Sequence, residues 1–566
     1  MSADSKPLSA RPARLDPAYL DVDELLDDLE HEVVFRNGAL FGSPMMREQR
    51  IPHEERKIAF ALSGGGAAGA YSAGSIEALL GRMKARKLAP SLLVGTSAGA
   101  LNSYGVFCEA LGRQNPQLAQ DPDIKQPYST FIASIWSYLD RNGRTSEWVV
   151  GRRAWMIDLV TKGLHTPLRR WTFFLFALLM VFVFNPFLFV SLFLFAGFHE
   201  YLPVLGDWTD EANAAWHLAL LGALSLGGLA AMTYALMRLF GQSLFLDTPL
   251  LRMLANTGVD GDLRAPTRWS AEQTRDRARV LSRDLVREWY SRIGTAPELI
   301  ITATDITVGR ECLFTLVRPE TYRRLVEQGW MAVQLDSEDD SQTRAYREIS
   351  GAVFSLGQNL LHCIVASTAV PSAFPAQEIR LYGPGQSRTV CHRFVDGGVL
   401  NNSPIHLSID AGATHIISLE LDPLKTQDPL ESDDRGRFYN ILEAGVTTFT
   451  TLLDRAIERD MRRTVTWNRF LTQHPQALAE QRSWIRRGAE DVREVKRVLP
   501  LYRIAPQERE IGTVEFDGAF EQGRNIATVR DVLRRGMLDL RGRHVWRATL
   551  QPTPFRGPDG LPSKAK

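Results

Sequence analysis

The sequence contains few cysteines, no surplus of basic residues and no long apolar run in its first 50 residues. Its four cysteines are scattered without a C-x-x-C pair, which argues against a disulfide framework or a zinc site and favours a reducing compartment. Lys+Arg 66 against Asp+Glu 65 gives a net charge of +1, so nucleic acid is not an expected partner. The first 50 residues are polar and lack the apolar region of a signal peptide, so we expect no secretory signal.

One stretch of the sequence, Leu92–Ala100, predicts a strand, a tight turn and the start of a helix. Its turn has the pattern G-x-S-x-G, with Ser97 between Gly95 and Gly99. At a strand-to-helix junction this pattern is typical of a nucleophile elbow, because the glycines permit a strained backbone and leave the serine hydroxyl accessible. The sequence therefore predicts Ser97 as a nucleophile.

A second glycine-rich turn follows the first apolar run of the chain. Gly64, Gly66 and Gly69 have G-x-G-x-x-G spacing, which suits either a dinucleotide-binding loop or an oxyanion hole. A dinucleotide loop requires an acidic residue about 20 residues further on, and residues 83–87 offer none. We therefore predict that the backbone N–H groups of Gly64, Gly65 and Gly66 form an oxyanion hole.

The third feature is Asp396-Gly397-Gly398, which ends a strand-like run that begins at His392. A D-G-G sequence by itself indicates only a turn. Combined with the two glycine-rich turns, it makes Asp396 a candidate general base. His392 is the alternative base, but four residues of extended strand separate the two by about 13 Å, so both cannot contact Ser97 unless the strand bends.

Together these motifs make the chain similar to the patatin-like phospholipase family, whose members join a G-x-G-x-x-G oxyanion loop, a G-x-S-x-G elbow and a D-G-[AG] aspartate. The resemblance covers roughly residues 57–422 apart from an insert. Ala68 departs from the family pattern, in which a basic residue often precedes the last glycine of the loop. Further stretches match in order: Phe245–Leu251, Thr302–Ile306, Ala366–Pro375 and Asn401–Pro404.

The resemblance implies a catalytic dyad without histidine, in which Asp396 takes the proton of Ser97 and later activates water on the acyl-enzyme. It implies neither a metal nor an organic cofactor. A carboxylate with its ordinary pKa of about 3.9 is a weak base at neutral pH. We therefore expect Asp396 to lie in a partly desolvated position, close to the Ser97 hydroxyl.

The alternation of strands and helices, together with the resemblance, predicts an α/β fold: a three-layer α/β/α sandwich with a mainly parallel sheet, interrupted by a transmembrane hairpin and followed by a helical C-terminal part. Leucines at helical spacing within Tyr19–Phe35 predict a short N-terminal helix. The expected segments are a polar N-terminal extension (1–56), the first part of the patatin-like domain (57–160), the hairpin insert (161–240), the second part of that domain (241–422) and a helical C-terminal region (423–566).

Two long apolar stretches lie inside the insert. Residues 171–198 and 218–237 carry no charge, and each run exceeds the roughly 18 residues that a membrane-spanning helix needs. A hydrophobic cap or a pair of buried core helices is the alternative. Arginines flank the pair, whereas the connecting loop, 199–217, has no Lys or Arg. Lys and Arg residues that flank membrane-spanning helices tend to stay on the cytoplasmic side. We therefore expect helices at 171–198 and 214–237 in a multi-pass membrane protein with a cytoplasmic catalytic domain.

These features predict a serine lipid acyl hydrolase, similar to a phospholipase or lysophospholipase, that cleaves glycerolipid acyl esters at the membrane. Membrane lipids are the expected substrates, while the headgroup and the oligomeric state stay open. One alternative is acyl transfer, in which an alcohol takes the place of water at the same dyad. Another is a membrane scaffold without turnover, against which the intact three-part site argues.

Overall fold

The computed structural model describes the parts of the chain that carry the three predicted motifs. The chain divides into two compact units, one made of Met1–Thr145, Asp247–Val370 and Ala376–Lys566, the other of Ser146–Leu246 and Pro371–Pro375. All three motifs belong to the first unit. The described residues are 19–31, 56–113, 132, 135–136, 247–257, 270–371, 374–384, 389–400, 404–421, 457–471, 473–474, 498–506, 529–540 and 545–550.

The predicted membrane hairpin, residues 171–198 and 214–237, lies outside the described residues. Among the helices that are described, none combines the length and the apolar character that crossing a membrane requires.

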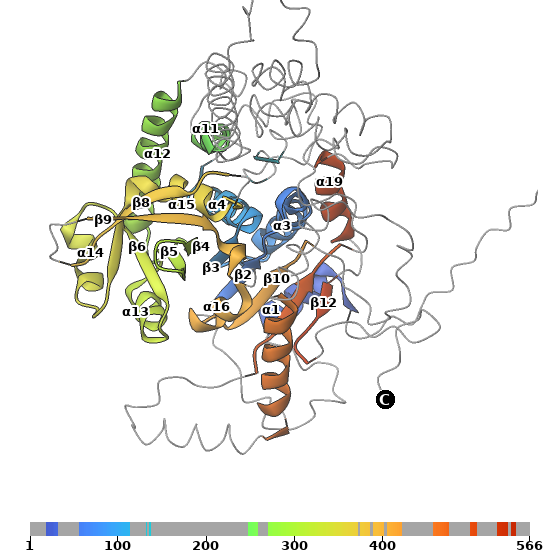
Figure 1. The fold of residues 1–566 in the computed structure, drawn as a ribbon. Helices are drawn as coiled ribbons and strands as arrows, with labels where there is room; N and C mark the ends of the chain where they lie inside the picture. The colour runs from blue at the N-terminus through green and yellow to red at the C-terminus, as the bar shows by residue number, and fades with distance from the viewer. Residues whose placement is uncertain are drawn as a thin grey trace, which may run out of the picture. The chain divides into compact units, whose positions relative to one another are not determined.

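The described strands form one sheet, and its centre is parallel (Figure 1). In order across the sheet lie β11 (Leu501–Ile504), β10 (His415–Leu419), β2 (Ile58–Leu62), β3 (Leu92–Thr96) and β4 (Glu298–Asp305). Every residue of these five strands is buried. Continuous burial is expected of parallel strands that are covered on both faces. The apolar runs that predicted β2, β3 and β10 are therefore strands of the buried centre.

Toward one end the sheet becomes mixed. β5 (Arg310–Leu316) runs antiparallel to β4, and β6 (Met331–Asp336) and β7 (Val353–Leu356) follow it in parallel. β9 (Val390–Asp396) pairs antiparallel with the last residues of β4 and with β8 (Gln377–Leu381). The prediction of a mainly parallel sheet thus holds for its centre, while antiparallel pairing with β4 places the end of β9 beside the parallel strands.

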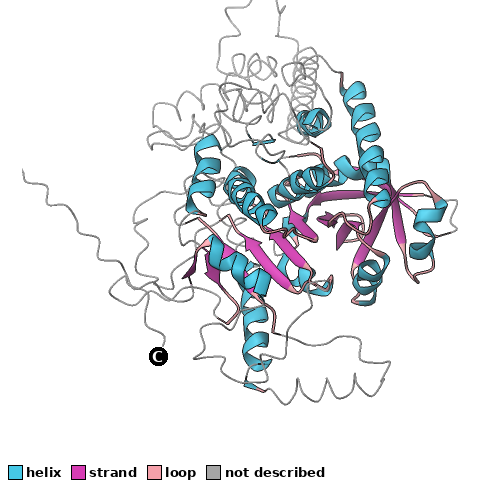
Figure 2. Cartoon of the chain, turned by 180° about the vertical axis from the view of Figure 1, so that it is seen from behind, coloured by secondary structure: helices cyan, strands magenta, loops and turns pink. Residues whose placement is uncertain are grey.

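Helices cover the sheet on both sides, as Figures 1 and 2 show. α3 (Gly69–Ala85), α4 (Ala98–Ala110) and α15 (Leu360–Ser367) lie on one side, and α13 (Pro319–Glu327) and α16 (Pro404–Asp410) on the other. The described structure is therefore the predicted three-layer α/β/α arrangement.

Two helices near β6 are started by side-chain caps. α12 (Ala271–Ser291) begins with a capping box, in which Ser270 and Gln273 each bind the other's backbone N–H. α14 (Asp340–Arg347) is capped by Asp339, whose carboxylate accepts the N–H of Ser341. A further helix, α11 (Asp247–Thr257), packs against α12. The local sequence thus fixes where these covering helices start.

The N-terminal extension contributes to the fold through a short strand and a helix. β1 (Tyr19–Leu20) pairs antiparallel with β12 (Val545–Arg547), and α1 (Val22–His31) forms within the stretch that was predicted to be helical. Asp28 of α1 makes an ion pair with Arg547 in a position where burial raises the pKa of Asp28 to about 6. The extension is therefore joined to the C-terminal strands of the same sheet.

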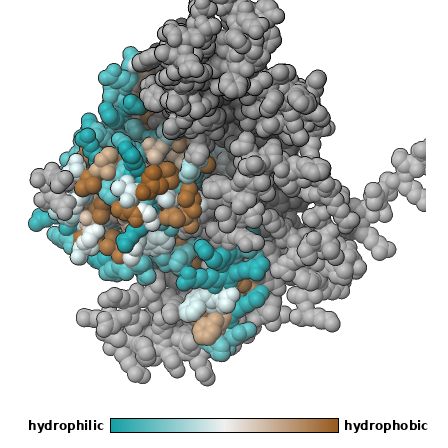
Figure 3. Space-filling view, in the orientation of Figure 1, coloured by the Kyte–Doolittle hydropathy of each residue, from teal (hydrophilic) through white to brown (hydrophobic). Residues whose placement is uncertain are grey.

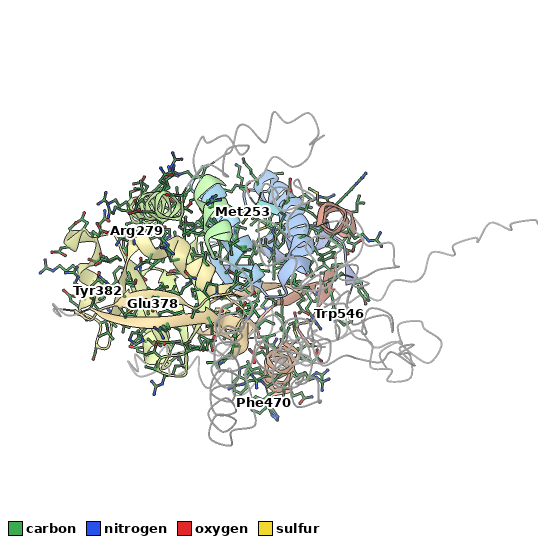
Figure 4. All side chains as sticks on the ribbon, turned by 45° about the horizontal axis from the view of Figure 1, so that its top comes forward. Met253, Arg279, Glu378, Tyr382, Phe470 and Trp546 are labelled. Carbon is green, nitrogen blue, oxygen red and sulfur yellow. The ribbon has the colours of Figure 1, made fainter. Side chains whose placement is uncertain are left out.

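The C-terminal region contributes strands as well as helices, so the prediction of a helical region was incomplete. β11 and β12 extend the sheet beyond β10, and residues 457–471 are helical. Trp546, on β12, and Tyr382, beside β8, lie toward opposite ends of the sheet in Figure 4. In β11 the charged Arg503 interrupts the apolar run expected of a buried strand, and β12 has three residues, too few to show a pattern.

A close helix crossing holds the C-terminal helix α19 (Val529–Asp539) on α3. A Cβ atom added at Gly74 of α3 would lie 1.9 Å from the carbonyl oxygen of Leu533, and one added at Gly536 of α19 would lie 2.1 Å from that of Tyr71. The two glycines therefore let the helix backbones touch. Through this contact the C-terminal region supports the helix that directly follows the glycine-rich turn.

Candidate active site

Ser97 occupies the turn between β3 and α4, as the elbow pattern predicts. Its backbone has φ 53° and ψ −121°, and the residue is only 8% exposed. Positive φ is uncommon for a residue with a Cβ atom and costs of order 1–3 kcal/mol, so the surrounding structure must hold it in place. Among the described residues other than glycine, only Lys87 and Glu338 share this feature. Strain at the predicted nucleophile is a property of nucleophile elbows.

The elbow glycines are required by close contacts between backbones. A Cβ atom at Gly95 would lie 2.4 Å from the carbonyl oxygen of Gly99, and one at Gly99 would lie 2.0 Å from that of Leu62. Leu62 is the last residue of β2, immediately before the glycine-rich turn. The first turn of α4 therefore rests directly on the point where the predicted oxyanion loop begins.

The glycine-rich turn lies against the start of α4. Gly66 has φ +59°, and a Cβ atom at Gly69 would lie 2.7 Å from the Cβ of Ala98. Gly64 is buried and Gly65 is partly exposed, where an added Cβ would lie 2.5 Å from a Leu421 methyl group. Within the described part of the chain, no hydrogen-bond acceptor binds the backbone N–H of Gly65 or Gly66. These two donors are therefore available to a developing oxyanion.

Asp396 lies at the end of β9 and is 2% exposed. Its backbone N–H donates to the carbonyl of Ala369 at 2.9 Å, and its carbonyl accepts from the Thr304 hydroxyl at 3.0 Å. The N–H of Gly398 donates to Oδ1 at 2.7 Å, while Oδ2 has no hydrogen-bond partner among the described residues. A Cβ atom at Gly397 would lie 2.3 Å from the Thr302 hydroxyl, so this turn also needs glycine.

The structure brings Ser97 and Asp396 together. Burial raises the pKa of Asp396 to about 7, and the neighbouring Ser97 hydroxyl and Gly398 N–H lower it by less. The Ser97 hydroxyl is thus near enough to stabilise the ionised form of Asp396 relative to the protonated form, although it does not make a full hydrogen bond with Oδ2. A base is most effective when its pKa is close to the working pH. Desolvation therefore brings the pKa of this carboxyl group into the range that suits a general base near neutral pH.

His392, the alternative base, is engaged elsewhere. Its Nδ1 lies 2.6 Å from Oδ2 of the buried Asp305, and its ring stacks on Phe394 at a centroid distance of 6.3 Å. β9 runs unbroken from Val390 to Asp396, so no sharp bend brings His392 toward Ser97. The geometry therefore favours Asp396 as the base.

Sequence reasoning missed the polar side chains that hold the site. The Ser97 N–H donates to the hydroxyl of Ser367 at 2.9 Å, and the hydroxyls of Thr96 and Thr302 lie 2.7 Å apart. Ser367 and Thr302 belong to two of the stretches that match the patatin-like family, which is the signal that could have selected them. The pattern alone does not show which residues they contact.

Comparison with known proteins agrees with this class of site. Residues 60–187 match the family model described as patatin-like phospholipase, a range that contains the glycine-rich turn and Ser97 but not Asp396. The chain thus carries a patatin-like phospholipase domain, which confirms the resemblance and indicates a lipid hydrolase. The crystal structure of VipD from Legionella pneumophila aligns with 87% of this chain and 67% of its own at 14% identity, and its TM-score of 0.25 is too low to carry an inference. Among curated proteins no sequence match was found.

Proposed function

We propose that the protein hydrolyses acyl esters of membrane glycerolipids, with Ser97 as the nucleophile and Asp396 as the general base. The observation that carries the proposal is the pairing of a strained serine with a buried carboxyl group whose pKa burial raises to about 7. Asp396 would take the hydroxyl proton while the Ser97 oxygen attacks the acyl carbon. The protonated carboxyl group would then give this proton to the departing alcohol oxygen, leaving an acyl-enzyme.

The carbonyl oxygen becomes negative in this step and needs donors that are already in place. The N–H groups of Gly65 and Gly66, together with the amino end of α4, suit this task because they carry partial positive charge at fixed positions. In the second half of the reaction, Asp396 would take a proton from water as the water oxygen attacks the acyl carbon. The bond from that carbon to the Ser97 oxygen would then break, Asp396 would return the proton to the Ser97 oxygen, and the fatty acid would leave. This scheme requires no group beyond the residues of the chain and water.

Exposed apolar residues near the site favour a lipid over a water-soluble ester. Val399 and Leu400, which directly follow the Asp396 turn, are 38% and 48% exposed. Ile306 and Val308, beyond the carboxyl end of β4, are 51% and 49% exposed. Figure 3 shows hydrophobic residues gathered on the side of the molecule where Figure 1 draws β8 and β9. Binding of an acyl chain to such a surface is favourable, because it removes apolar groups of both the lipid and the protein from water.

The direct test combines product analysis with labelling. Purified full-length protein would be incubated with vesicles of mixed glycerophospholipids, and the products would be identified by mass spectrometry. We expect free fatty acid and the corresponding lysolipid, and we expect a fluorophosphonate probe to modify the peptide that contains Ser97. Acylated alcohols in place of fatty acid would indicate acyl transfer instead. Labelling of a different serine, or no product at all, would contradict the proposal.

We further propose that residues 171–198 and 214–237 cross the membrane as a hairpin, with the catalytic domain on the cytoplasmic side. At about 1.5 Å per residue a helix over 171–198 would be roughly 42 Å long, more than the roughly 30 Å hydrocarbon layer, so it must tilt, kink or extend into the headgroups. Two crossings return the chain to its starting side. Both halves of the patatin-like domain can then meet on one face of the membrane.

The topology predicts a labelling pattern on intact cells. Single cysteines would be placed at Asp207, in the connecting loop, and at Lys425, in a variant whose four native cysteines are replaced. A membrane-impermeant maleimide should label position 207 only. Esterase activity of the cysteine-free protein is the control, because Cys108, Cys312 and Cys363 are buried. Labelling of position 425 alone would invert the topology, and labelling of neither position before lysis would favour a cap.

A further inference from the structure

One short segment holds the backbones of both proposed catalytic residues. Ser367, the last residue of α15, accepts the N–H of Ser97 on its hydroxyl at 2.9 Å. Two residues further on, the carbonyl of Ala369 accepts the N–H of Asp396 at 2.9 Å. The nucleophile and the base come from strands on either side of β4, so this segment bridges parts of the fold that are far apart in sequence.

The contact with Ser367 meets a specific need of the elbow. Because the backbone turns sharply at Ser97, its N–H leaves the hydrogen-bond ladder that joins β3 to β4, and a buried N–H requires another acceptor. The hydroxyl of Ser367, a fully buried residue, supplies that acceptor. The Ser97 N–H is thereby occupied, which leaves the glycine-rich turn and the first N–H groups of α4 to receive the oxyanion.

The two catalytic residues depend on this segment to different degrees. Asp396 is also held through its carbonyl by the Thr304 hydroxyl and through its carboxylate by the Gly398 N–H. The carbonyl of Ser97 is held within the first turn of α4 by the N–H of Ala100 at 2.9 Å, whereas its own N–H is held by the hydroxyl of Ser367. Loss of the Ser367 hydroxyl should therefore leave the Ser97 N–H without its acceptor and let this side of the turn shift, while Asp396 stays in place.

We propose that Ser367 is a positioning residue, which fixes the strained backbone of Ser97 so that its hydroxyl faces Asp396, and that Ser367 and Ala369 together set the spacing of the dyad. This inference rests on the proposed function. Ser367 touches no reacting atom, so its loss should slow the chemical step and leave substrate binding unchanged. A displaced hydroxyl would also stop favouring the Asp396 carboxylate, so the rise of activity with pH should move to higher pH.

The test compares three serine variants in the full-length protein. Ser367→Ala should lower kcat and the rate of fluorophosphonate labelling by roughly 10²-fold, because a small displacement of a reacting atom has an effect of that size. KM should stay as in the wild type, and the midpoint of the pH–rate profile should rise. Ser367→Thr, which keeps the hydroxyl, should recover most of the rate. Ser408→Ala is the matched control, since this buried serine donates to the Pro404 carbonyl on α16, outside the site.

Three results would overturn the positioning role: wild-type labelling rate and pH midpoint in Ser367→Ala, equal losses in Ser367→Ala and Ser408→Ala, or a rise in KM with kcat unchanged. If Ser367→Ala does not fold, Ser367→Cys offers a weaker acceptor of similar size and should give an intermediate rate. A wild-type rate in Ser367→Cys would also overturn the positioning role of Ser367. Failure of the proposed function is distinguishable, because the wild type itself would then show neither hydrolysis nor labelling at Ser97.

Discussion

Ser97→Ala and Asp396→Asn should each lower ester hydrolysis by several orders of magnitude, and the double variant should be little worse than either single variant. When two residues act in the same chemical step, removing either one abolishes the effect of both, so their losses of transition-state stabilisation are not additive. Asn at position 396 still offers an oxygen to the Gly398 N–H, which keeps the turn intact while it removes the base. The measurement is kcat/KM for a soluble ester and for lipid vesicles, with folding checked by circular dichroism.

The control for this experiment is the alternative base. His392→Asn keeps a donor for Asp305 but cannot serve as a base, and we expect it to retain activity within about tenfold of the wild type. Multiplicative losses in the Ser97–Asp396 double variant would show that the two residues act in separate steps. A loss in His392→Asn as large as that in Asp396→Asn would transfer the role of base to the histidine.

The parts of the site that could be predicted from sequence are those that local backbone geometry dictates. Gly95, Gly99 and Gly397 stand where any Cβ atom would meet a neighbouring backbone or hydroxyl oxygen at under 2.5 Å, so the sequence must carry glycine there. The buried parallel strands were equally legible, because a strand covered on both faces is a continuous apolar run. A glycine in a short motif therefore indicates that another part of the protein lies very close to the backbone there, even when the sequence does not identify that part.

The partners themselves could not be predicted, because tertiary packing sets them. Ser97 and Ser367 are 270 positions apart, and neither pattern contains information about the other. Likewise β9 reaches the site only because it pairs antiparallel with β4, and the buried Arg503 of β11 is accommodated only because it forms an ion pair with Glu420. Sequence thus indicates which residues are constrained, and the fold determines what they contact.

Asp396→Asn should also stabilise the protein at pH 8 while it abolishes activity. Burial raises the pKa of Asp396 from 3.8 to about 7, so between these values the folded protein holds a proton that the unfolded chain has released. The stability that this group contributes is therefore full below about pH 4 and is lost as the pH rises through 7. At about 1.4 kcal/mol per pKa unit, the buried carboxylate costs on the order of 4 kcal/mol at pH 8, a cost that a neutral amide avoids.

The measurement is the denaturant midpoint of wild type and Asp396→Asn at pH 4, 6 and 8, with the full-length protein in detergent. The advantage of the variant should be largest at pH 8, smaller at pH 6 and near zero at pH 4. Ser97→Ala supplies the complementary case, because it removes the hydroxyl that favours the carboxylate and should therefore lower stability at pH 8 only. A stability difference that does not change with pH would mean that Asp396 is not a destabilised carboxylate, and desolvation would no longer explain how it serves as a base.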